Sequence, residues 1–144
     1  MVKPEPLGVS LIMSAWNYPY YTGLPYVAMC IAAGNCVLYK PSERAAHCSN
    51  VQSALFEGFL DKRYYRVLEG GVKTAQKLTS NPNIDNIIFT GGSEIGKLVA
   101  QAAAKNLIPC ILELGGKNCT IVDETADLKS TCRKISFGKF ANGG

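Results

Sequence analysis

A carboxylate followed by two glycines is the pattern in this sequence that is best suited to chemistry. Glu113 comes directly after the apolar run 110–112, and Leu114, Gly115 and Gly116 follow it. Side chains leave an open α/β sheet at the carboxyl ends of its strands, and glycines there let backbone approach a ligand closely. This position is therefore a candidate site for chemistry. An ordinary strand-to-loop turn with an incidental acid explains these residues equally well when they are taken alone.

Two more polar groups follow earlier apolar runs. Asn17 lies in an aromatic loop, residues 16–21, where its amide could donate hydrogen bonds to a developing oxyanion. Core packing is the expected role of most aromatic residues in that loop. Glu43 follows the run 36–39, at the place where a doubly wound domain binds ribose hydroxyls. A helix with Ser42 as N-cap and Glu43 at its positive end is the alternative, and both interpretations can hold together.

A glycine-rich turn, Gly91, Gly92 and Ser93, precedes a further helical pattern. Such a turn suits a phosphate, because free backbone N–H groups and the positive end of the helix dipole meet there. Ser93 occupies the second glycine position of the Gly-x-Gly-x-x-Gly fingerprint, so this signal is weak by itself.

Strands and helices alternate along the predicted chain. Apolar runs bounded by turn residues predict strands at residues 9–13, 36–39, 65–69, 86–90, 110–113 and 119–122. Helical patterns lie at residues 24–33, after Ser42 with Val51, Ala54 and Leu55 at helical spacing, at 72–79, from Ile95 with Leu98, Val99, Ala102 and Ala103 on its apolar face, and at 126–140. This alternation predicts an α/β fold with a doubly wound, mostly parallel sheet and helices on both faces. The candidate sites all follow strands, so we expect them at one edge of the sheet.

Composition indicates one globular domain and argues against several classes of partner. The chain has 144 residues, of which 47% are hydrophobic, and its net charge of +4 is scattered along the sequence. Without a basic cluster, nucleic acid is not an expected partner. The amino terminus lacks the pattern of a signal peptide, and the longest apolar stretch, 24–38, is interrupted and too short to span a bilayer. We therefore expect a soluble cytoplasmic protein with no membrane segment.

The six cysteines do not have the spacing of a metal site. They form no Cys-x-x-Cys pair, and His47 is the only histidine. Most of them lie among apolar residues, where a reduced cysteine behaves as a small hydrophobic side chain. We expect structural thiols and no metal.

Four segments, in this order and spacing, resemble the nucleotide-binding region of the NAD(P)-dependent aldehyde dehydrogenases. They are Trp16-Asn17-Tyr18-Pro19, Lys40-Pro41-Ser42-Glu43, Phe89-Thr90-Gly91-Gly92-Ser93-Glu94-Ile95-Gly96 and Glu113-Leu114-Gly115-Gly116-Lys117. The loop at Gly70 and Gly71 and the segment 103–109 resemble the class 3 branch, the fatty and aromatic aldehyde dehydrogenases. The resemblance covers nearly the whole chain and implies a Rossmann-like fold.

The resemblance also implies a role for each candidate residue. Asn17 would donate its amide to the oxyanion that forms when a thiolate attacks the aldehyde, and Glu113 would be the general base that releases the acyl group from its thioester. Lys40 and Glu43 would hold the adenosine ribose. The remaining residues that the resemblance places at the cofactor are Trp16, Ser42, Gly71, Gly91, Gly92, Ser93, Gly96, Leu114 and Gly115.

The sequence departs from the family in what it lacks. The catalytic cysteine of the family follows an Asn-x-Gly-Gln-x-Cys segment, which would place it about three positions beyond Gly144, and none of the six cysteines lies in such a segment. We therefore expect residues 1–144 to be an NAD(P)-binding domain that is incomplete at both ends, has no catalytic domain and is inactive alone. Gly92 stands where many members have serine, so one hydroxyl contact to the pyrophosphate is missing.

Two other functions stay open. One is a non-catalytic dinucleotide-binding or interaction module that kept the fold and lost the reaction. The other is a relative that makes an acyl phosphate or acyl-CoA, against which Glu113 argues, because those reactions have less need of a base that activates water.

Cofactor choice depends on the charges of two side chains. Glu43 can bind a ribose diol and would repel a 2′-phosphate, which favours NAD. Lys40 would offset part of that repulsion, which leaves NADP as a second cofactor. The complete enzyme would act on a small-molecule aldehyde and form a homo-oligomer.

Overall fold

Five short strands form one parallel sheet in the computed structural model, which describes residues 1–143. The strands are β1 (Val9–Met13), β2 (Cys36–Lys40), β3 (Tyr65–Val67), β4 (Asn86–Gly91) and β5 (Cys110–Leu114). Their order across the sheet is β3-β2-β1-β4-β5, and every neighbouring pair is parallel. The chain builds outward from β1 in one direction and then returns to build outward in the other. The carboxyl ends of β1 and β4 therefore flank a topological switch point.

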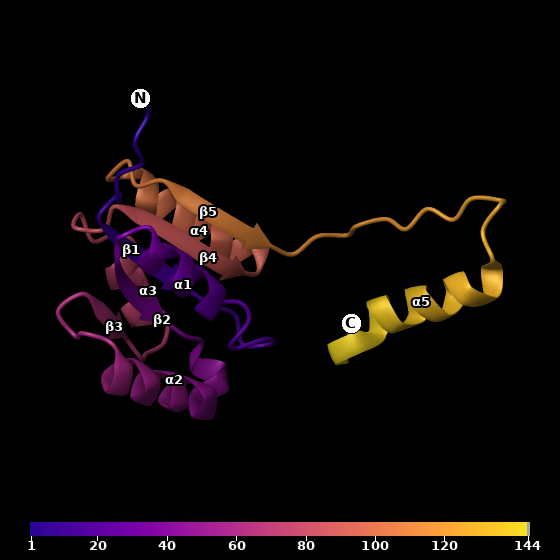
Figure 1. Cartoon of the computed structure of the whole chain (residues 1–144), viewed down its shortest axis with the longest axis horizontal. Helices are drawn as coiled ribbons and strands as arrows, with labels where there is room; N and C mark the ends of the chain where they lie inside the picture. Colours follow the sequence, from indigo (N-terminus) through magenta and orange to yellow (C-terminus); the bar gives the residue numbers. More distant parts are fainter. Residues whose placement is uncertain (144) are drawn as a thin grey trace.

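Helices cover both faces of the sheet (Figure 1). They are α1 (Leu24–Ala32), α2 (Ala46–Phe59), α3 (Val72–Thr79) and α4 (Ser93–Ala104), with a 3-10 turn, η1 (Glu43–Ala45), before α2. One core cluster joins Leu11 and Ile87 of the sheet to Val99 of α4. A second cluster, on the opposite face, joins Ile12 to Val27 of α1 and Phe56 of α2. The doubly wound α/β fold predicted from the sequence is confirmed.

The central strands have the burial expected of a sheet that is covered on both faces. Four of the five residues of β1 are buried, and Leu11 and Ile12, which point to opposite faces, are both fully inaccessible to solvent. Gly34 follows the end of α1. Its φ is +83°, and the N–H groups of Gly34 and Asn35 bond back to the carbonyls of Ile31 and Cys30.

The apolar residues whose spacing indicated α2 do not form its buried side. Val51, Ala54 and Leu55 are all exposed, whereas Ser49, Gln52 and Phe56 are buried. The apolar spacing was misleading because two buried positions of this helix carry polar side chains that are hydrogen-bonded to other elements.

The predicted apolar face of α4 is divided between two environments. Val99 and Ala103 are buried in the core, whereas Ile95 and Leu98 are more than half exposed. Both exposed residues line a cavity, so their apolar character reflects a surface that is open to a ligand.

The predicted strand 119–122 does not form. Residues 115–127 contain no helix or strand, and the chain leaves the sheet after β5, as Figure 1 shows. A strand requires a neighbour to complete its hydrogen bonds, and no segment among residues 1–143 pairs with this one.

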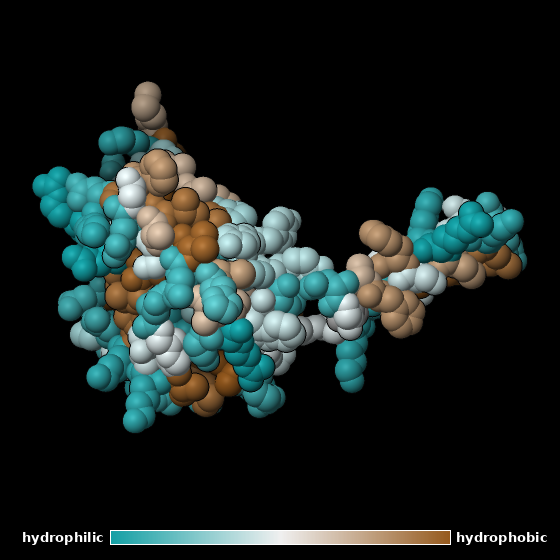
Figure 2. Space-filling view, turned by 90° about the horizontal axis from the view of Figure 1, so that it is seen from below, coloured by the Kyte–Doolittle hydropathy of each residue, from teal (hydrophilic) through white to brown (hydrophobic). Residues whose placement is uncertain are grey.

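The last helix, α5 (Leu128–Phe140), lies apart from the sheet and is followed by the 3-10 turn η2 (Ala141–Gly143). Asp127 caps α5 by accepting bonds from the N–H groups of Lys129 and Ser130. None of its residues is buried, and Figure 2 shows it as an amphipathic arm with apolar side chains open along one side. Leu128, Phe137 and Phe140 are among the exposed apolar side chains of this helix.

The cysteines differ in their surroundings. Cys30 is buried in the α1 cluster, as expected of a structural thiol, whereas Cys119 and Cys132 are exposed. Burial raises the pKa of the Cys110 thiol above its usual value.

Among residues 1–143, no helix has the length and apolar character needed to cross a membrane.

Candidate functional site

A cavity of about 1110 Å³ opens at the carboxyl edge of the sheet. Its lining comes from the ends of β1, β2, β4 and β5 and from the helices α3 and α4. Small-molecule pockets usually measure about 300–1,000 Å³, so this cavity is large enough for an extended ligand. It lies at the topological switch point, where open α/β sheets bind their ligands.

Most of the residues predicted for the site meet at this cavity. Those that line it are Glu113, Asn17, Trp16, Lys40, Ser42, Glu43, Gly71, Gly91, Gly92, Leu114 and Gly115. Ser93 and Gly96 are not part of the lining. The structure therefore brings together the segments that follow four different strands, while the chemical role of each residue stays a prediction.

Gly96 has a packing role in this structure. A Cβ atom at Gly96 would lie 2.5 Å from Cδ2 of Leu114, so the absent side chain lets α4 approach β5 closely. Close packing of helix on strand is also the role of the last glycine in dinucleotide-binding turns.

Lys40 is a nearly buried cation at one end of the cavity. Its residue is 5% exposed, and its Nζ donates to Oε2 of Glu43 and to the carbonyl oxygen of Pro41, both at 3.1 Å. Burial opposes ionisation of Glu43, but hydrogen bonds to its own backbone and to Lys40, with the charges of Lys40 and Arg44, outweigh it. The pKa of the Glu43 carboxyl is therefore lowered. The pair forms a charged rim where the chain passes from β2 into η1.

Ser42 caps the following turn, as predicted, although this turn is η1 and not the start of α2. Its Oγ accepts a hydrogen bond from the N–H of Arg44 at 3.4 Å. The cap holds Glu43 and Arg44 at the cavity rim, which makes the helix-cap interpretation and the ligand-binding interpretation compatible.

Glu113 and Asn17 approach the same cavity from two strands that are not neighbours. Glu113 lies in β5 beside Thr90 of β4, and Asn17 lies in the loop after β1. Glu113 is solvent-exposed, as is the Asn17 residue. A carboxylate and an amide that face one cavity can supply a base and an oxyanion donor to the same bound group.

The first turn of α4 presents free backbone donors. Gly92 is its N-cap, with φ −70° and ψ 147°, and no side chain caps the helix. A Cβ atom at Gly92 would meet nothing within 4 Å, so the space in front of the turn is open. The site therefore combines an open cradle with the positive end of a twelve-residue helix.

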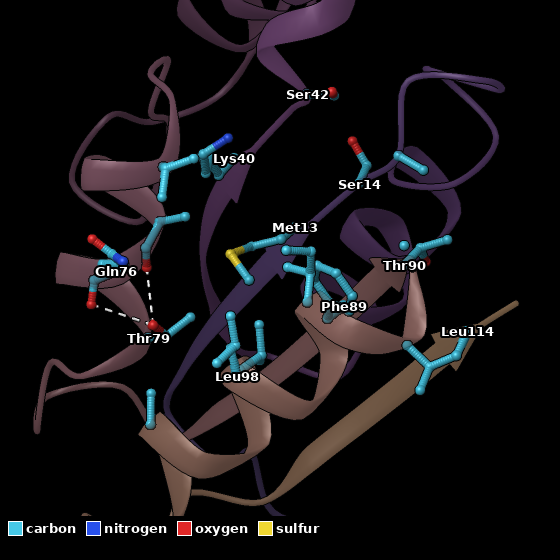
Figure 3. Close-up of a pocket in the computed structure, with 18 of the residues that line it drawn as sticks. Met13, Ser14, Lys40, Ser42, Gln76, Thr79, Phe89, Thr90, Leu98 and Leu114 are labelled. Atoms are coloured by element: carbon cyan, nitrogen blue, oxygen red, sulfur yellow. Dashed lines mark hydrogen bonds between the residues drawn. The ribbon is translucent and has the colours of Figure 1, made fainter.

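An apolar floor lies between α3 and α4, which the sequence analysis did not assign to the site. Figure 3 shows Met13, Phe89 and Leu98 gathered on this floor, with Gln76 and Thr79 on α3 across from them. The sequence does carry a signal for this floor, because small or apolar residues recur at helical spacing after Gly71. The Oγ1 of Thr79 donates to the carbonyls of Ala75 and Gln76, at 3.0 and 3.3 Å, and so adds no unpaired hydroxyl to the cavity.

Asn142 is a second contact that the sequence analysis missed. Its Nδ2 donates to the carbonyl oxygen of Asn17 at 3.1 Å, across 125 positions of sequence. The chain after β5 thus runs away from the sheet and returns its last described residues to the loop that carries Asn17.

Comparisons with known proteins agree on one family. The model of the Aldehyde dehydrogenase family matches residues 1–144. Over 143 residues, or 99% of this chain, the sequence is 44% identical to the mouse "Aldehyde dehydrogenase, dimeric NADP-preferring" and 43% identical to the rat "Aldehyde dehydrogenase family 3 member A2". Among solved structures, the aldehyde dehydrogenase of Mycobacterium tuberculosis complexed with NAD+ superposes with a TM-score of 0.89 at 38% identity over 96% of this chain.

The match covers only part of each relative. The chain spans 31% of the mouse protein, 29% of the rat protein and 29% of the mycobacterial chain.

Proposed function

This chain belongs to the aldehyde dehydrogenase family, and we propose that it is the NAD(P)-binding region of a class 3-like enzyme that oxidises an aldehyde to a carboxylic acid. One observation carries the proposal: segments that follow four different strands, each predicted to serve this reaction, line a single cavity at the switch point of the sheet. We also propose that the longer enzyme forms a homo-oligomer, since the mouse relative is named dimeric.

The residues present fit a dinucleotide. The uncapped first turn of α4 and the open space at Gly92 would receive the pyrophosphate. Lys40 and Glu43 would hold the adenosine ribose, and the apolar floor between α3 and α4 would receive the flat adenine ring. When bound, the cofactor accepts a hydride from the substrate.

Two side chains of this region would serve the substrate. The Asn17 amide would donate to the substrate oxygen as it becomes an oxyanion, which stabilises the charge that develops during thiolate addition. Glu113 would take a proton from water, so that the resulting nucleophile attacks the acyl carbon of the thioester and releases the acid. Both residues line the cavity.

The nucleophile is not supplied by this part of the molecule. None of the six cysteines within residues 1–143 lines the cavity. We therefore propose that the 144-residue chain binds the cofactor and does not turn over aldehyde by itself.

The first experiment tests cofactor binding. Trp16 is the only tryptophan and lines the cavity, so excitation of Trp16 should transfer energy to NADH bound there. We expect saturable transfer that added NAD+ competes away. A titration with no saturable signal for NADH or NADPH would contradict the proposed function.

The second experiment tests the reaction in a chimera that joins residues 1–144 to the remaining residues of the mouse relative. We expect this chimera to produce NADH or NADPH from an aldehyde. Glu113→Gln should keep one stoichiometric burst of reduced cofactor and lower steady turnover by about 10²-fold or more, because it removes only the base of the final step.

Glu124→Gln is the matched control, because Glu124 is exposed and does not line the cavity. It should turn over like the parent chimera. A chimera that folds and binds the cofactor without any burst would favour the alternative, a dinucleotide-binding module that has lost the reaction.

A further inference from the structure

Gln52 is a fully buried amide whose hydrogen bonds all leave its own helix. Its Nε2 donates to the carbonyl oxygen of Pro19 at 2.7 Å, and its Oε1 accepts from the hydroxyl of Tyr39 at 3.3 Å. A buried polar side chain inside an otherwise apolar cluster costs stability unless both of its ends are bonded. The amide therefore connects α2 to a loop that is distant in sequence.

Tyr39 is the second member of this network. It is fully buried in β2, and its ring stacks on Phe56 of α2 with centroids 5.7 Å apart. Its hydroxyl lies 2.9 Å from Oγ of Ser14 and 3.3 Å from the carbonyl oxygen of Pro19. Burial raises the pKa of Tyr39, with hydrogen bonds to Ser14 and Gln52 acting in the opposite direction, so the hydroxyl keeps its proton at neutral pH.

The loop that these bonds hold is also fixed at its start, where the N–H of Ser14 donates to the carbonyl of Lys40 at 3.2 Å. It connects β1 to α1 through residues 14–23 and carries Trp16 and Asn17, both exposed and both at the cavity. Inside the loop, Oγ1 of Thr22 accepts from the N–H of Ala15 at 3.1 Å and donates to the carbonyl of Tyr18 at 3.0 Å. Thr22 therefore closes the loop on itself, whereas contacts with Gln52 and Tyr39 fix it to the rest of the fold.

The loop also packs tightly where it enters α1. A Cβ atom at Gly23 would lie 2.3 Å from the Tyr39 hydroxyl, so only glycine lets the chain pass this close. The loop thus contacts Tyr39 at Pro19 and at Gly23, on either side of the two tyrosines at positions 20 and 21.

We propose that Gln52 and Tyr39 are positioning residues that set the place of Trp16 and Asn17 in the cavity. They act through the Pro19 carbonyl, and neither of them lines the cavity. What the loop is positioned for rests on the proposed function, but the positioning itself is a property of the chain without ligand.

Ser49 offers a matched control on the same side of α2. It is also buried, and its Oγ donates to Oε1 of Glu69 at 2.9 Å, in the segment after β3. Its loss removes a buried hydrogen bond from the same helix without touching the loop of Trp16. This control therefore distinguishes a general loosening of α2 from a specific release of the loop.

The experiment measures the time-resolved fluorescence anisotropy of Trp16 in the 144-residue chain without cofactor. We expect Gln52→Met, which has similar volume and no amide, to lower the residual anisotropy of Trp16 to about half of the wild-type value, because the loop loses its hydrogen bond to α2. Tyr39→Phe removes only the hydroxyl and should act in the same direction. Ser49→Ala should match the wild type.

Circular dichroism identifies the variants that are folded at the temperature of the measurement. If Gln52→Met does not fold, Tyr39→Phe decides the question, because the ring and its stacking on Phe56 are retained. Wild-type anisotropy in the folded loop variants would overturn the proposal, and so would an equal loss in Ser49→Ala. NADH titration of the same samples reports separately on the proposed function. If the wild-type chain does not bind NADH, that function is refuted, and the anisotropy comparison remains valid.

Discussion

At the scale of single residues, the end of the cavity beside β2 is defined by a buried charge. Lys40 keeps its ammonium group in a nearly inaccessible position with two oxygen partners, Glu43 and the carbonyl of Pro41. Removing the charged partner of an ammonium ion in such a place costs more stability than removing one partner of an exposed ion pair. The carboxylate of Glu43 therefore both stabilises the fold and presents negative charge to a ligand.

Glu43→Gln should change both properties. We expect a loss of about 1 kcal/mol in the free energy of unfolding, because Lys40 keeps only neutral partners. We also expect the ratio of NADPH to NADH affinity to rise by about tenfold, because a 2′-phosphate no longer meets a carboxylate. Urea denaturation and titrations of Trp16 energy transfer measure the two effects.

The pH dependence of this variant has a definite sign. The pKa of Glu43 is lowered in the folded chain. The carboxylate therefore contributes fully to stability when the pH is above the ordinary pKa of 4.5, and this contribution disappears as the pH falls through the lower pKa of the folded chain. The stability difference between wild type and Glu43→Gln should therefore shrink on acidification below pH 4.5. A difference that is constant from neutral to acidic pH would show that the Lys40–Glu43 pair does not contribute.

At the scale of elements, the start of α4 contributes to the cavity. Gly92 leads into α4 with the extended backbone of an N-cap and has a negative φ that any residue can adopt. The helix nevertheless starts without a capping side chain, so its first N–H groups are satisfied only by solvent or by a ligand.

Gly92→Ser should strengthen this helix end. A serine hydroxyl accepts from the first turn and can donate its proton to a phosphate, and the space for it is open. We expect a gain of a few tenths of a kcal/mol in the free energy of unfolding and about threefold tighter binding of NADH. Thermal denaturation and the Trp16 titration measure both.

Gly92→Ala is the control, because it adds the Cβ atom without the hydroxyl. Its NADH affinity should stay at the wild-type level. Weaker binding of NADH by the serine variant would mean that the phosphate occupies the place of the hydroxyl, against the site described above.

The elements also show what can be predicted from local sequence. The apolar runs of β1 and β4 and the helix Val72–Thr79 were located correctly, because buried parallel strands and glycine-bounded helices leave clear local patterns. The buried side of α2 could not be predicted from the spacing of its apolar residues, because Gln52 and Ser49 are buried through partners 33 and 20 positions away. Such long-range hydrogen bonds leave no local pattern in the sequence. For the same reason, the hydrogen bonds that support the loop of Asn17 could not be predicted.

At the scale of the whole molecule, strand order explains why the site segments meet. The motifs after β1, β2, β4 and β5 are far apart in sequence, and only the order β3-β2-β1-β4-β5 places them around one cavity. The family, predicted from those motifs, and the fold class, predicted from the alternation of strands and helices, are confirmed. The segment 119–122 was predicted as a strand because it is apolar, but this part of the molecule provides no neighbouring strand for it.

Stability is concentrated in the part of the chain that ends with β5. All the buried hydrophobic side chains of residues 1–143 lie between Leu11 and Ile108, and α5 has none. An isolated helix of this length is marginal in water, so α5 contributes little free energy to the fold.

Deletion of residues 118–144 should therefore leave the core unchanged. We expect a free energy of unfolding within about 0.5 kcal/mol of the value for the 144-residue chain, since the deletion removes no buried contact and only exposed hydrogen bonds such as that between Asn142 and Asn17. Affinity for NADH should also be retained, because every lining residue of the cavity precedes the cut. Urea denaturation and the Trp16 titration test both expectations. A loss of about 2 kcal/mol or more would mean that α5 packs against the sheet domain in solution and stabilises it.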